Sequence, residues 1–330
     1  MEPSSDYKKL GFPNREMFTF PNIVNVEVYR GSCPCYCNHC PVGKQKKADR
    51  VDFFGKRNID KTLYEKIINE VANYPHSSIR LHSVGEPLDS PNIDELLELH
   101  RNGVVFWLFT CGVTEDENLI KLLCQKVDII EVSINSTNRE DYLNTKGIDA
   151  FSLVKKNIKL MRDYIDLYGN NSRLIVSRVQ SRSVEMDNEF IDYWKASGLV
   201  EDAIVRSYHT YNNIINPLSQ NDHFNSHEPC LVHWGRFNIT VDGFATVCFN
   251  ELFRKELNPD ITLGNINDQS IAEVWKGEAL NSIRKAELSG EYPETQLFSN
   301  LPCRNCYTCQ PLTGSNQTSE YQLRRKGDLI

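Results

Sequence analysis

The chain lacks any long hydrophobic run. No apolar stretch approaches the roughly 20 residues that span a membrane, and the N-terminal segment has no apolar core of a secretion signal. Basic residues are also few: 37 Lys and Arg face 44 Asp and Glu, which gives a net charge of −7. A general nucleic-acid surface needs a basic excess. Repeats and low-complexity tracts are absent too. We therefore expect no membrane and no nucleic-acid partner.

Cysteine, in contrast, is plentiful, with 11 residues. A chain of 330 residues can build a sufficient core without disulfides. Nine of the 11 cysteines fall in short clusters with ligand-like spacing, the pattern expected of metal sites in a reducing cytoplasm. We therefore predict a cytoplasmic metalloprotein. The isolated Cys111 and Cys124 are expected to be buried thiols.

Between Ile23 and Tyr208 the chain alternates β-rich runs with amphipathic helical stretches. Strict alternation is typical of a parallel sheet with right-handed crossovers, and six units are too few to close an eight-stranded barrel. We therefore predict an α/β fold, a partial (β/α)6 TIM-like barrel with its ligands at the carboxyl ends of the strands. The predicted strands are Ile23–Arg30, Ser78–Val84, Val104–Thr110, Asp128–Ile134, Ser172–Gln180 and Ala203–Tyr208. The predicted helices are Lys61–Asn73, Ile93–Arg101, Glu117–Lys126, Phe151–Tyr168 and Asp187–Ser197.

The composition changes after residue 210. The polar segment Asn212–Glu228 indicates a linker or a substrate-side loop. Two alternating strands then flank Asp242-Gly243, a pair typical of a type I′ hairpin, and Ser270–Leu288 is predicted to be one helix. We expect a small C-terminal domain built from a cysteine-rich β-hairpin plus helix. The expected division is an N-terminal extension (1–22), the barrel (23–210), the C-terminal domain (211–312) and a polar tail (313–330).

A loop of three cysteines follows the first predicted strand. Cys33, Cys37 and Cys40 have three and then two residues between them. Three thiolates can hold three irons of a [4Fe–4S] cluster and leave the fourth iron open to a small molecule, whereas a closed cluster needs four thiolates. Cys35, inside the same loop, is the candidate fourth thiolate. Zinc is the alternative, although structural zinc sites usually come as paired CxxC knuckles. Its fourth ligand would be His39, His82 or Cys35.

The CxxxCxxC spacing resembles the radical S-adenosylmethionine (SAM) superfamily, whose signature is this loop. The resemblance implies a [4Fe–4S] cluster with an open iron that binds SAM. Val84-Gly85-Glu86-Pro87 resembles the GGEP element of the family, with Val84 in place of its first glycine, and Thr110-Cys111-Gly112 resembles its TNG turn. The GGEP element would receive the SAM amino group. Ser133 and Asn135 follow the fourth strand, where the family offers polar groups to the SAM ribose and carboxylate.

Two further residues extend the resemblance. Arg178, or Gln180 beside it, would reach the methionyl carboxylate or the substrate from the fifth strand. His39 stands where the family usually has an aromatic residue, and its planar ring would pack against adenine. Taken alone, each feature could be an ordinary turn, strand-end cap or surface ion pair. Their occurrence at successive strand ends favours a SAM-binding site over these structural roles. The implied SAM-binding residues are Gly85, Glu86, Pro87, Thr110, Gly112, Ser133, Asn135, Arg178 and His39.

A second group of five cysteines lies in the C-terminal region. One hairpin and one knuckle can enclose a four-iron cluster and close it to ligands. The arrangement resembles the SPASM/twitch extension of radical SAM enzymes, which implies one auxiliary [4Fe–4S] cluster here. Cys306 and Cys309 compete for the fourth ligand position, and a zinc ribbon-like site is the alternative. The five residues are Cys230, Cys248, Cys303, Cys306 and Cys309.

The resemblance implies a 5′-deoxyadenosyl radical that abstracts hydrogen from an unactivated carbon, with electrons from a flavodoxin or ferredoxin-type donor. About 22 residues precede the first strand, too few for a leader-binding module. We therefore expect a polyol or sugar-like small molecule, a cyclitol or nucleoside-like compound included, to be oxidised or epimerised at a carbinol carbon. Cys111 or Cys35 would donate hydrogen in an epimerisation. The substrate pocket is expected in the Tyr208–Tyr211 loop and Asn212–Glu228, with Glu189, His209 and His233 as hydroxyl partners.

Three alternatives stay open. The first is modification of a ribosomally made peptide, which differs in substrate only. The second is a non-catalytic electron-transfer protein with two closed clusters, which requires Cys35 as a ligand. The third is a zinc-stabilised interaction module.

Overall fold

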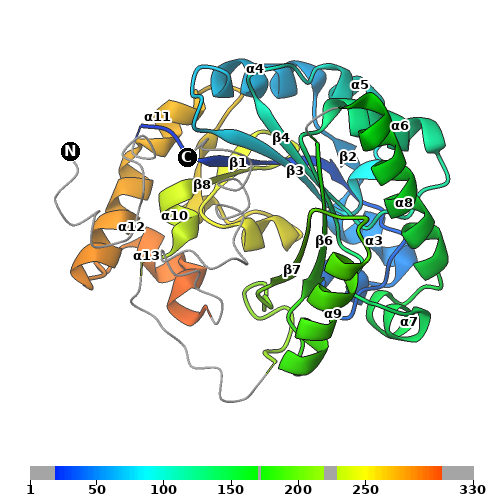
Figure 1. The fold of residues 1–330 in the computed structure, drawn as a ribbon. Coiled ribbons are helices and arrows are strands. Elements are labelled where there is room, and N and C mark those ends of the chain that lie inside the picture. The colour runs from blue at the N-terminus through cyan, green and yellow to red at the C-terminus, as the bar shows by residue number, and fades with distance from the viewer. Residues whose placement is uncertain (1–18, 170–171, 219–228, 307–330) are drawn as a thin grey trace.

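The computed structural model describes residues 19–169, 172–218 and 229–306. Six parallel strands follow one another in the order of the chain and form most of one sheet, and helices surround them (Figure 1). This arrangement confirms the predicted α/β fold, a partial barrel of the TIM type. The strands are β1 (Ile23–Arg30), β3 (Ser78–Val84), β4 (Val105–Thr110), β5 (Ile129–Val132), β6 (Arg173–Val179) and β7 (Asp202–Arg206).

Five helices cover the outer face of these strands. Each buries one apolar stripe; on α8 the stripe includes Val154, Ile158 and Ile165, none more than 2% exposed. Together with the outward face of the strands these stripes form the main core. The helices are α4 (Lys61–Val71), α5 (Ile93–Glu98), α6 (Glu117–Lys126), α8 (Phe151–Tyr168) and α9 (Val184–Ala196).

Periodicity located these helices better than it located their ends. Both α6 and α8 begin and end at the predicted residues. Helix α9 begins three residues before the predicted Asp187, because the Ser183 side chain accepts a hydrogen bond from the Met186 amide and caps the helix there. The predicted extents of α4 and α5 were too long by two and three residues at their C-terminal ends.

The C-terminal hairpin extends the barrel sheet. Strand β8 (Arg236–Ile239) pairs parallel with β1 over Ile23–Val26, and β9 (Phe244–Thr246) and β10 (Thr262–Asn265) follow antiparallel. The predicted type I′ turn is wrong. Gly243 has φ +86°, whereas Asp242 is outside the positive-φ region that this turn requires, and the Gly243 amide donates to Thr240 O.

The predicted single helix over Ser270–Leu288 is also wrong. The segment forms α11 (Ile271–Trp275) and α12 (Glu278–Ser289), because Gly277 is extended and serves as the N-cap of the second helix. Several short elements gave no periodic signal and were not predicted. They are α2 (Pro41–Lys44), α3 (Lys47–Phe54), β2 (Arg57–Asn58), η2 (Pro87–Asp89), α7 (Arg139–Lys146), α10 (Leu231–Gly235), η3 (Phe249–Phe253), η4 (Pro259–Ile261), α13 (Gln296–Asn300) and η5 (Pro302–Asn305).

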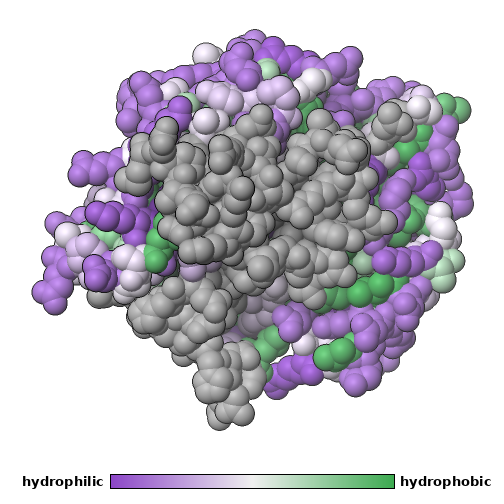
Figure 2. Space-filling model, turned by 60° about the vertical axis from the view of Figure 1, so that its left-hand side comes forward, coloured by the Kyte–Doolittle hydropathy of each residue, from purple (hydrophilic) through white to green (hydrophobic). Residues whose placement is uncertain are grey.

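The surface in the view of Figure 2 is mostly hydrophilic over the described residues, with small apolar areas scattered among charged ones. Within the described ranges, we find no helix that is both long and apolar enough for a membrane span. The isolated thiols are buried as predicted: Cys124 is 0% and Cys111 7% exposed.

His100 is a buried, neutral histidine of the barrel wall. Its Nε2 lies 2.6 Å from the Tyr64 hydroxyl and its Nδ1 lies 3.2 Å from the carbonyl oxygen of Lys126. Because a carbonyl only accepts, Nδ1 carries the hydrogen and Nε2 accepts from Tyr64. Burial is the main reason that the pKa of His100 falls to about 3.

We expect this histidine to make the protein acid-labile. The unfolded chain takes up a proton on this side chain near pH 6.5, whereas folded His100 excludes the proton. The contribution of neutral His100 to the free energy of unfolding is therefore complete above about pH 6.5. It is lost as the pH falls toward 3, by up to about 1.4 kcal/mol per pH unit. The His100→Gln variant cannot titrate there. Urea unfolding of both proteins across this window should show a shallower pH dependence in the variant, and identical slopes would contradict the expectation.

Candidate active site and auxiliary cluster site

The cysteine loop leaves β1 at the carboxyl edge of the sheet and is fixed to the turn after β3. The Gly31 amide donates to Val84 O and the Glu86 amide donates to Ser32 O, both at 2.9 Å. Gly85 has φ +150°, and a Cβ there would lie 2.3 Å from the Ser32 oxygen. Glycine is therefore required for the two turns to approach this closely.

Helix α7 clamps the middle of the same loop. The amide of Tyr36 donates to the carbonyl oxygen of Lys146 at 2.7 Å, and that of Asn38 donates to Thr145 O at 3.2 Å. A Cβ on Gly147 would lie 2.7 Å from the Cβ of Tyr36, so the chain passes close to the loop. The C-terminal carbonyls of α7, which have no partner in their own helix, thus satisfy the amides of the loop.

Two buried cations support the loop. Arg50 of α3, 1% exposed, donates from Nη1 to the Cys33 carbonyl oxygen at 2.5 Å, and its guanidinium lies over the Tyr36 ring. Lys146, also 1% exposed, donates from Nζ to Ser133 Oγ at 2.8 Å. The nearby thiolates, led by Cys37, raise the pKa of Lys146 against the effect of burial, so the lysine places a positive charge beside the loop.

The loop cysteines divide by exposure. Cys33, Cys37 and Cys40 are half-buried, whereas Cys35 is 1% exposed and lies behind them. A hydrogen bond from Cys35 lowers the pKa of Cys37 to about 7, with burial opposing and Lys146 assisting. A lowered pKa favours the thiolate that binds metal. The three cysteines of the motif therefore reach the open side of the loop, and Cys35 does not.

Cys111 lies against the loop from the end of β4. Its thiol is hydrogen-bonded to Cys33 and Cys35, and its amide donates to Glu86 Oε2 at 2.7 Å. Cys35 and Cys111, the two candidate hydrogen donors, are thus packed against each other and against the ligand loop.

The carboxylate of Glu86 connects the turn of residues 85–87 (the GEP turn) to the turn of residues 110–112 (the TCG turn). Its Oε1 accepts from the Thr110 hydroxyl at 2.5 Å, and Thr110 Oγ1 in turn accepts from the Gly112 amide at 2.9 Å. Burial, with the charge of Cys33 second, raises the pKa of Glu86 to about 7. The side chain of Glu86 therefore holds two turns together. Pro87, the last residue of the GEP turn, is buried and is the first residue of η2.

Of the remaining predicted SAM residues, Ser133, Asn135 and Arg178 lie at the ends of β5 and β6, whereas His39 lies in the cysteine loop. Asn135, with φ +62°, accepts from the Val179 amide at 2.6 Å and its Nδ2 lies 3.4 Å from Ser133 Oγ. Arg178 turns toward α9, where its Nε lies 3.1 Å from Asp187 Oδ1. Burial and then the charges of Lys146 and Arg178 lower the pKa of the partly exposed His39 to about 3. The fold thus brings the ends of β5 and β6 to the cysteine loop.

The barrel interior changes from apolar to polar along the strands. Its base is an apolar cluster made of Ile23, Trp107, Ile129, Ile175 and Ile204. Because inward positions recur every two residues, the next layer toward the carboxyl ends is mainly polar. Arg80 belongs to this layer, because it is in register with Asn25 and lies over the Phe109 ring. The members are Asn25, Arg80, Phe109, Glu131, Ser177 and Arg206.

Two groups of this polar layer have clear partners. Arg206 forms a double contact with Glu131 at 3.0 and 2.6 Å, and Asn25 donates to Asn238 of β8 at 2.7 Å. His82 of β3 faces the same interior and is 5% exposed, and neither of its ring nitrogens is hydrogen-bonded within the described residues. Burial keeps the pKa of His82 well below its usual value, so the ring is neutral.

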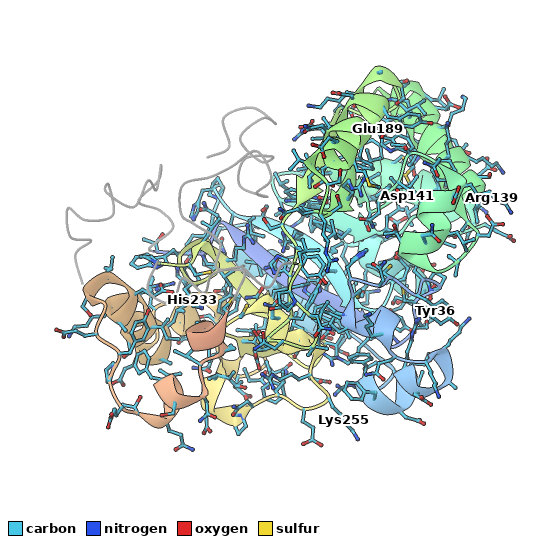
Figure 3. The ribbon with its side chains drawn as sticks, turned by 90° about the horizontal axis from the view of Figure 1, so that it is seen from below. Tyr36, Arg139, Asp141, Glu189, His233 and Lys255 are labelled. Atoms are coloured by element: carbon cyan, nitrogen blue, oxygen red, sulfur yellow. The ribbon has the colours of Figure 1, made fainter. Side chains whose placement is uncertain are left out.

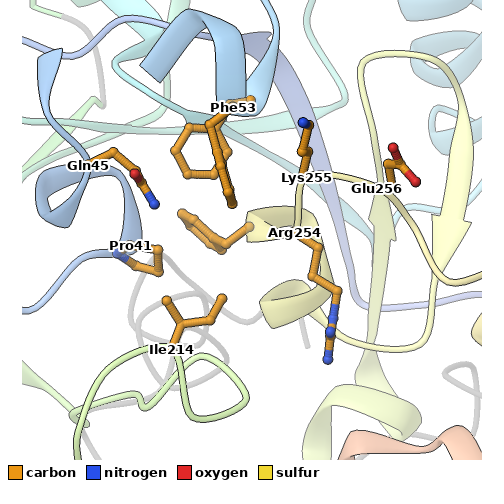
Figure 4. A pocket seen from close by; sticks show the side chains of 9 residues that line it. Pro41, Gln45, Phe53, Ile214, Arg254, Lys255 and Glu256 are labelled. Carbon is orange, nitrogen blue, oxygen red and sulfur yellow. The ribbon is translucent and has the colours of Figure 1, made fainter. Parts of the chain in front are cut away.

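An open cavity of about 350 Å³ lies beside the cysteine loop (Figure 4). One wall comes from α2 and α3 and the other from the end of η3, so the cavity joins the barrel to the C-terminal elements. Its lining is aromatic and aliphatic with charged residues at one side: Pro41, Gln45, Phe53, Phe54, Ile214, Phe253, Arg254, Lys255 and Glu256.

The C-terminal cysteines also gather. Burial raises the pKa of Cys248 well above its usual value, and the charges of Cys303, Cys306 and Cys230 add to the effect, so these three lie near Cys248. Cys230 and Cys248 are the N-cap residues of α10 and η3, and Cys303 and Cys306 lie in and just after η5, so the four come from distant parts of the chain. Cys309, the other candidate for the fourth position, lies outside the described residues.

Both sets fit iron–sulfur clusters by their chemistry, because each presents half-buried thiols from loops. Among the described residues, no three side chains converge on a point that would hold one metal ion. A four-iron cluster needs thiolates spread around a larger cube.

Comparison with known sequence families identifies the chain. Residues 29–181 match the family described as the Radical SAM superfamily, and residues 230–310 match SPASM, described as an iron-sulfur cluster-binding domain. The chain belongs to the radical SAM superfamily. Its cofactors are accordingly SAM, a [4Fe–4S] cluster in the radical SAM domain and auxiliary iron–sulfur clusters in the C-terminal region.

A curated relative of this radical SAM enzyme is the PqqA peptide cyclase of Gluconobacter oxydans (strain 621H), 23% identical over 328 residues, or 83% of this chain and 79% of the relative. Solved structures share the fold. Streptococcus suis SuiB bound to its precursor peptide SuiA has a TM-score of 0.61 at 14% identity, covering 81% of this chain and 67% of SuiB. BtrN in complex with AdoMet and 2-DOIA has a TM-score of 0.51 at 17% identity, covering 86% of this chain and 92% of BtrN.

Two of the expected substrate contacts are wrong. Glu189 lies on the exposed face of α9 and His233 is buried among the C-terminal elements, away from the Tyr36 side of the molecule (Figure 3). His209 is in the interior, where burial and then nearby arginines lower its pKa to about 4. Sequence reasoning missed Arg50 and Lys146, because each belongs to a short helix without an apolar period.

Proposed function

We propose that this radical SAM enzyme oxidises a carbinol carbon of a polyol, a cyclitol or a sugar- or nucleoside-like small molecule. The observation that supports this proposal is the polar barrel interior, which holds the Glu131–Arg206 pair and also His82, whose ring packs against Phe249 while neither ring nitrogen is hydrogen-bonded within the described residues. Hydroxyl groups pair well with such side chains, because each hydroxyl both donates and accepts. When bound, SAM with the first cluster supplies a hydrogen-abstracting radical, and the auxiliary cluster supplies an electron acceptor.

His82 would hold the proton that this oxidation releases. A carbinol that becomes a carbonyl loses one hydrogen atom from carbon, one electron and the hydroxyl proton. Neutral His82 has one ring nitrogen that can accept this proton, and general-base catalysis typically contributes 10²–10⁴-fold. The apolar base of the interior would exclude water below the substrate.

Oxidation is favoured over epimerisation by the position of the thiols. Epimerisation needs a hydrogen donor that faces the substrate radical. Cys35 and Cys111 are instead buried and hydrogen-bonded to each other. A flavodoxin or ferredoxin-type protein would supply electrons, and the exposed cations Lys44, Lys46 and Lys47 beside the cysteine loop would suit its acidic surface.

The test is substrate-dependent release of 5′-deoxyadenosine by protein that is reconstituted without oxygen. A panel of cyclitols, sugars and nucleosides should include compounds that stimulate release and yield a carbonyl product. In His82→Phe, that stimulation should fall by about 10²–10⁴-fold while the slow substrate-free cleavage of SAM persists. His100→Phe is the matched control, because His100 is also buried but stacks on Phe106 of the main core, outside the barrel interior.

Modification of a ribosomally made peptide is the second candidate. It is favoured by the curated relative, a PqqA peptide cyclase, and by the apolar cavity between the cysteine loop and η3, which would accept side chains of an extended peptide. Turnover of a peptide encoded beside this protein, with no response to any polyol, would overturn the first proposal and support the second.

A further inference from the structure

A buried carboxylate organises the surroundings of Cys230 and Cys303. Glu287 of α12, 6% exposed, accepts three hydrogen bonds from different groups. Its Oε1 lies 2.6 Å from His233 Nδ1 and 3.3 Å from the Cys230 amide, and its Oε2 lies 2.7 Å from Trp234 Nε1. The Cys230 amide and Trp234 Nε1 can only donate, so both oxygens of Glu287 are acceptors, and Nδ1 of His233 donates to Oε1.

The other nitrogen of His233 points at the cysteines. Its Nε2 lies 3.7 Å from the sulfur of Cys303, within hydrogen-bonding distance for sulfur. The ring is 1% exposed and cannot turn away without breaking the bond to Glu287. Arg284 adds a further restraint, since its Nε donates to the His233 carbonyl oxygen at 2.9 Å. The orientation of the imidazole is therefore fixed by α12 before any cluster is bound.

We propose that His233 is a positioning residue of the auxiliary cluster, held by Glu287 so that its imidazolium, with hydrogen on both ring nitrogens, donates a hydrogen bond from Nε2 to the predicted cluster ligand Cys303. This inference concerns the auxiliary cluster alone and does not depend on which substrate the enzyme oxidises. A carboxylate hydrogen-bonded to one ring nitrogen fixes the orientation of a histidine beside a metal site.

Such a hydrogen bond has a defined physical effect. Reduction adds an electron to the cluster and its sulfurs, and a donor or positive charge at a sulfur stabilises that added charge. Hydrogen bonds to the sulfurs are one of the factors that set cluster potentials. His233 should therefore raise the reduction potential of the auxiliary cluster and make it a better electron acceptor.

The experiment uses a full-length protein whose first cluster is removed by Cys33→Ala, Cys37→Ala and Cys40→Ala together, so that only the auxiliary cluster is observed. In this background, His233→Leu should keep about four irons per chain, as one [4Fe–4S] cluster requires, and shift the midpoint potential to a more negative value in an EPR-monitored titration. Glu287→Gln keeps an acceptor for the ring but removes the charge, and should shift the potential less in the same direction.

His100→Leu is the matched control, because it also removes a buried histidine with two hydrogen bonds and should leave the potential unchanged. An intact cluster with an unshifted potential in His233→Leu would overturn the proposal. Loss of the cluster in His233→Leu that is restored by His233→Cys would also overturn it, because His233 would then be a ligand.

A measurement on the unsubstituted side chains guards against misfolded variants. With ¹⁵N-labelled histidine in the background that carries only the auxiliary cluster, pulsed EPR should detect a weak nitrogen coupling, as expected for a hydrogen bond to a ligand sulfur. The strong coupling of a directly bound nitrogen, or no coupling, would each contradict the proposal.

Discussion

The Cys37→Ala variant is expected to lose the first cluster and all radical chemistry. Cys37 is the central thiol of the three, and hydrogen bonding from Cys35 lowers its pKa to about 7. With one of three thiolates removed, the open-iron cluster cannot be held, so iron should fall from about eight to about four per chain. The EPR change on adding SAM and the release of 5′-deoxyadenosine should both disappear, as measured after anaerobic reconstitution.

Cys35→Ala is the control for this experiment. It removes a thiol from the same loop, but one that is 1% exposed and turned away from the open side. We expect iron content and the response to SAM to be retained. If Cys35→Ala also lost about four irons, Cys35 would be a ligand and the cluster would be closed, which is the arrangement of an electron-transfer protein.

Gly85→Ala is expected to disable the same site without touching a ligand. The new Cβ would lie 2.3 Å from the Ser32 oxygen, so the GEP turn and the start of the cysteine loop would have to separate. The Glu86 amide would then lose its bond to Ser32, and the SAM-binding edge would move relative to the cluster. We expect SAM binding to be lost, measured by equilibrium dialysis on the reconstituted protein.

Gly103→Ala separates this steric effect from backbone strain. Gly103 also has a positive φ, +91°, but a Cβ there would meet nothing within 4 Å. Both substitutions carry the strain of placing alanine at positive φ, on the order of 1–3 kcal/mol, and only Gly85→Ala adds a collision with backbone. Equal losses of SAM binding in the two variants would show that close packing at Gly85 is not the cause.

The local pattern of the sequence was enough to predict the barrel. Helices such as α8 bury a continuous apolar stripe, and strands such as β1 are buried along their whole length, so both leave a signal within one segment. The cysteine loop was also predictable, because the three ligand positions lie within eight residues. Turn geometry was harder: Asp242-Gly243 is compatible with several hairpins, and the chosen one depends on the bond between Gly243 and Thr240.

By itself, then, the sequence determined the order of the barrel elements, the parallel sheet and the two clusters of cysteines. Only the tertiary structure decided how those cysteines are supported. Lys146 reaches the cysteine loop across more than 100 residues, and Glu287 meets His233 across 54. Such pairs form between segments that fold separately and then pack, and a single polar residue on a helix carries no periodic signal of its distant partner. The continuation of the barrel sheet through β8 was hidden for the same reason, since strand pairing is chosen by neighbours in space.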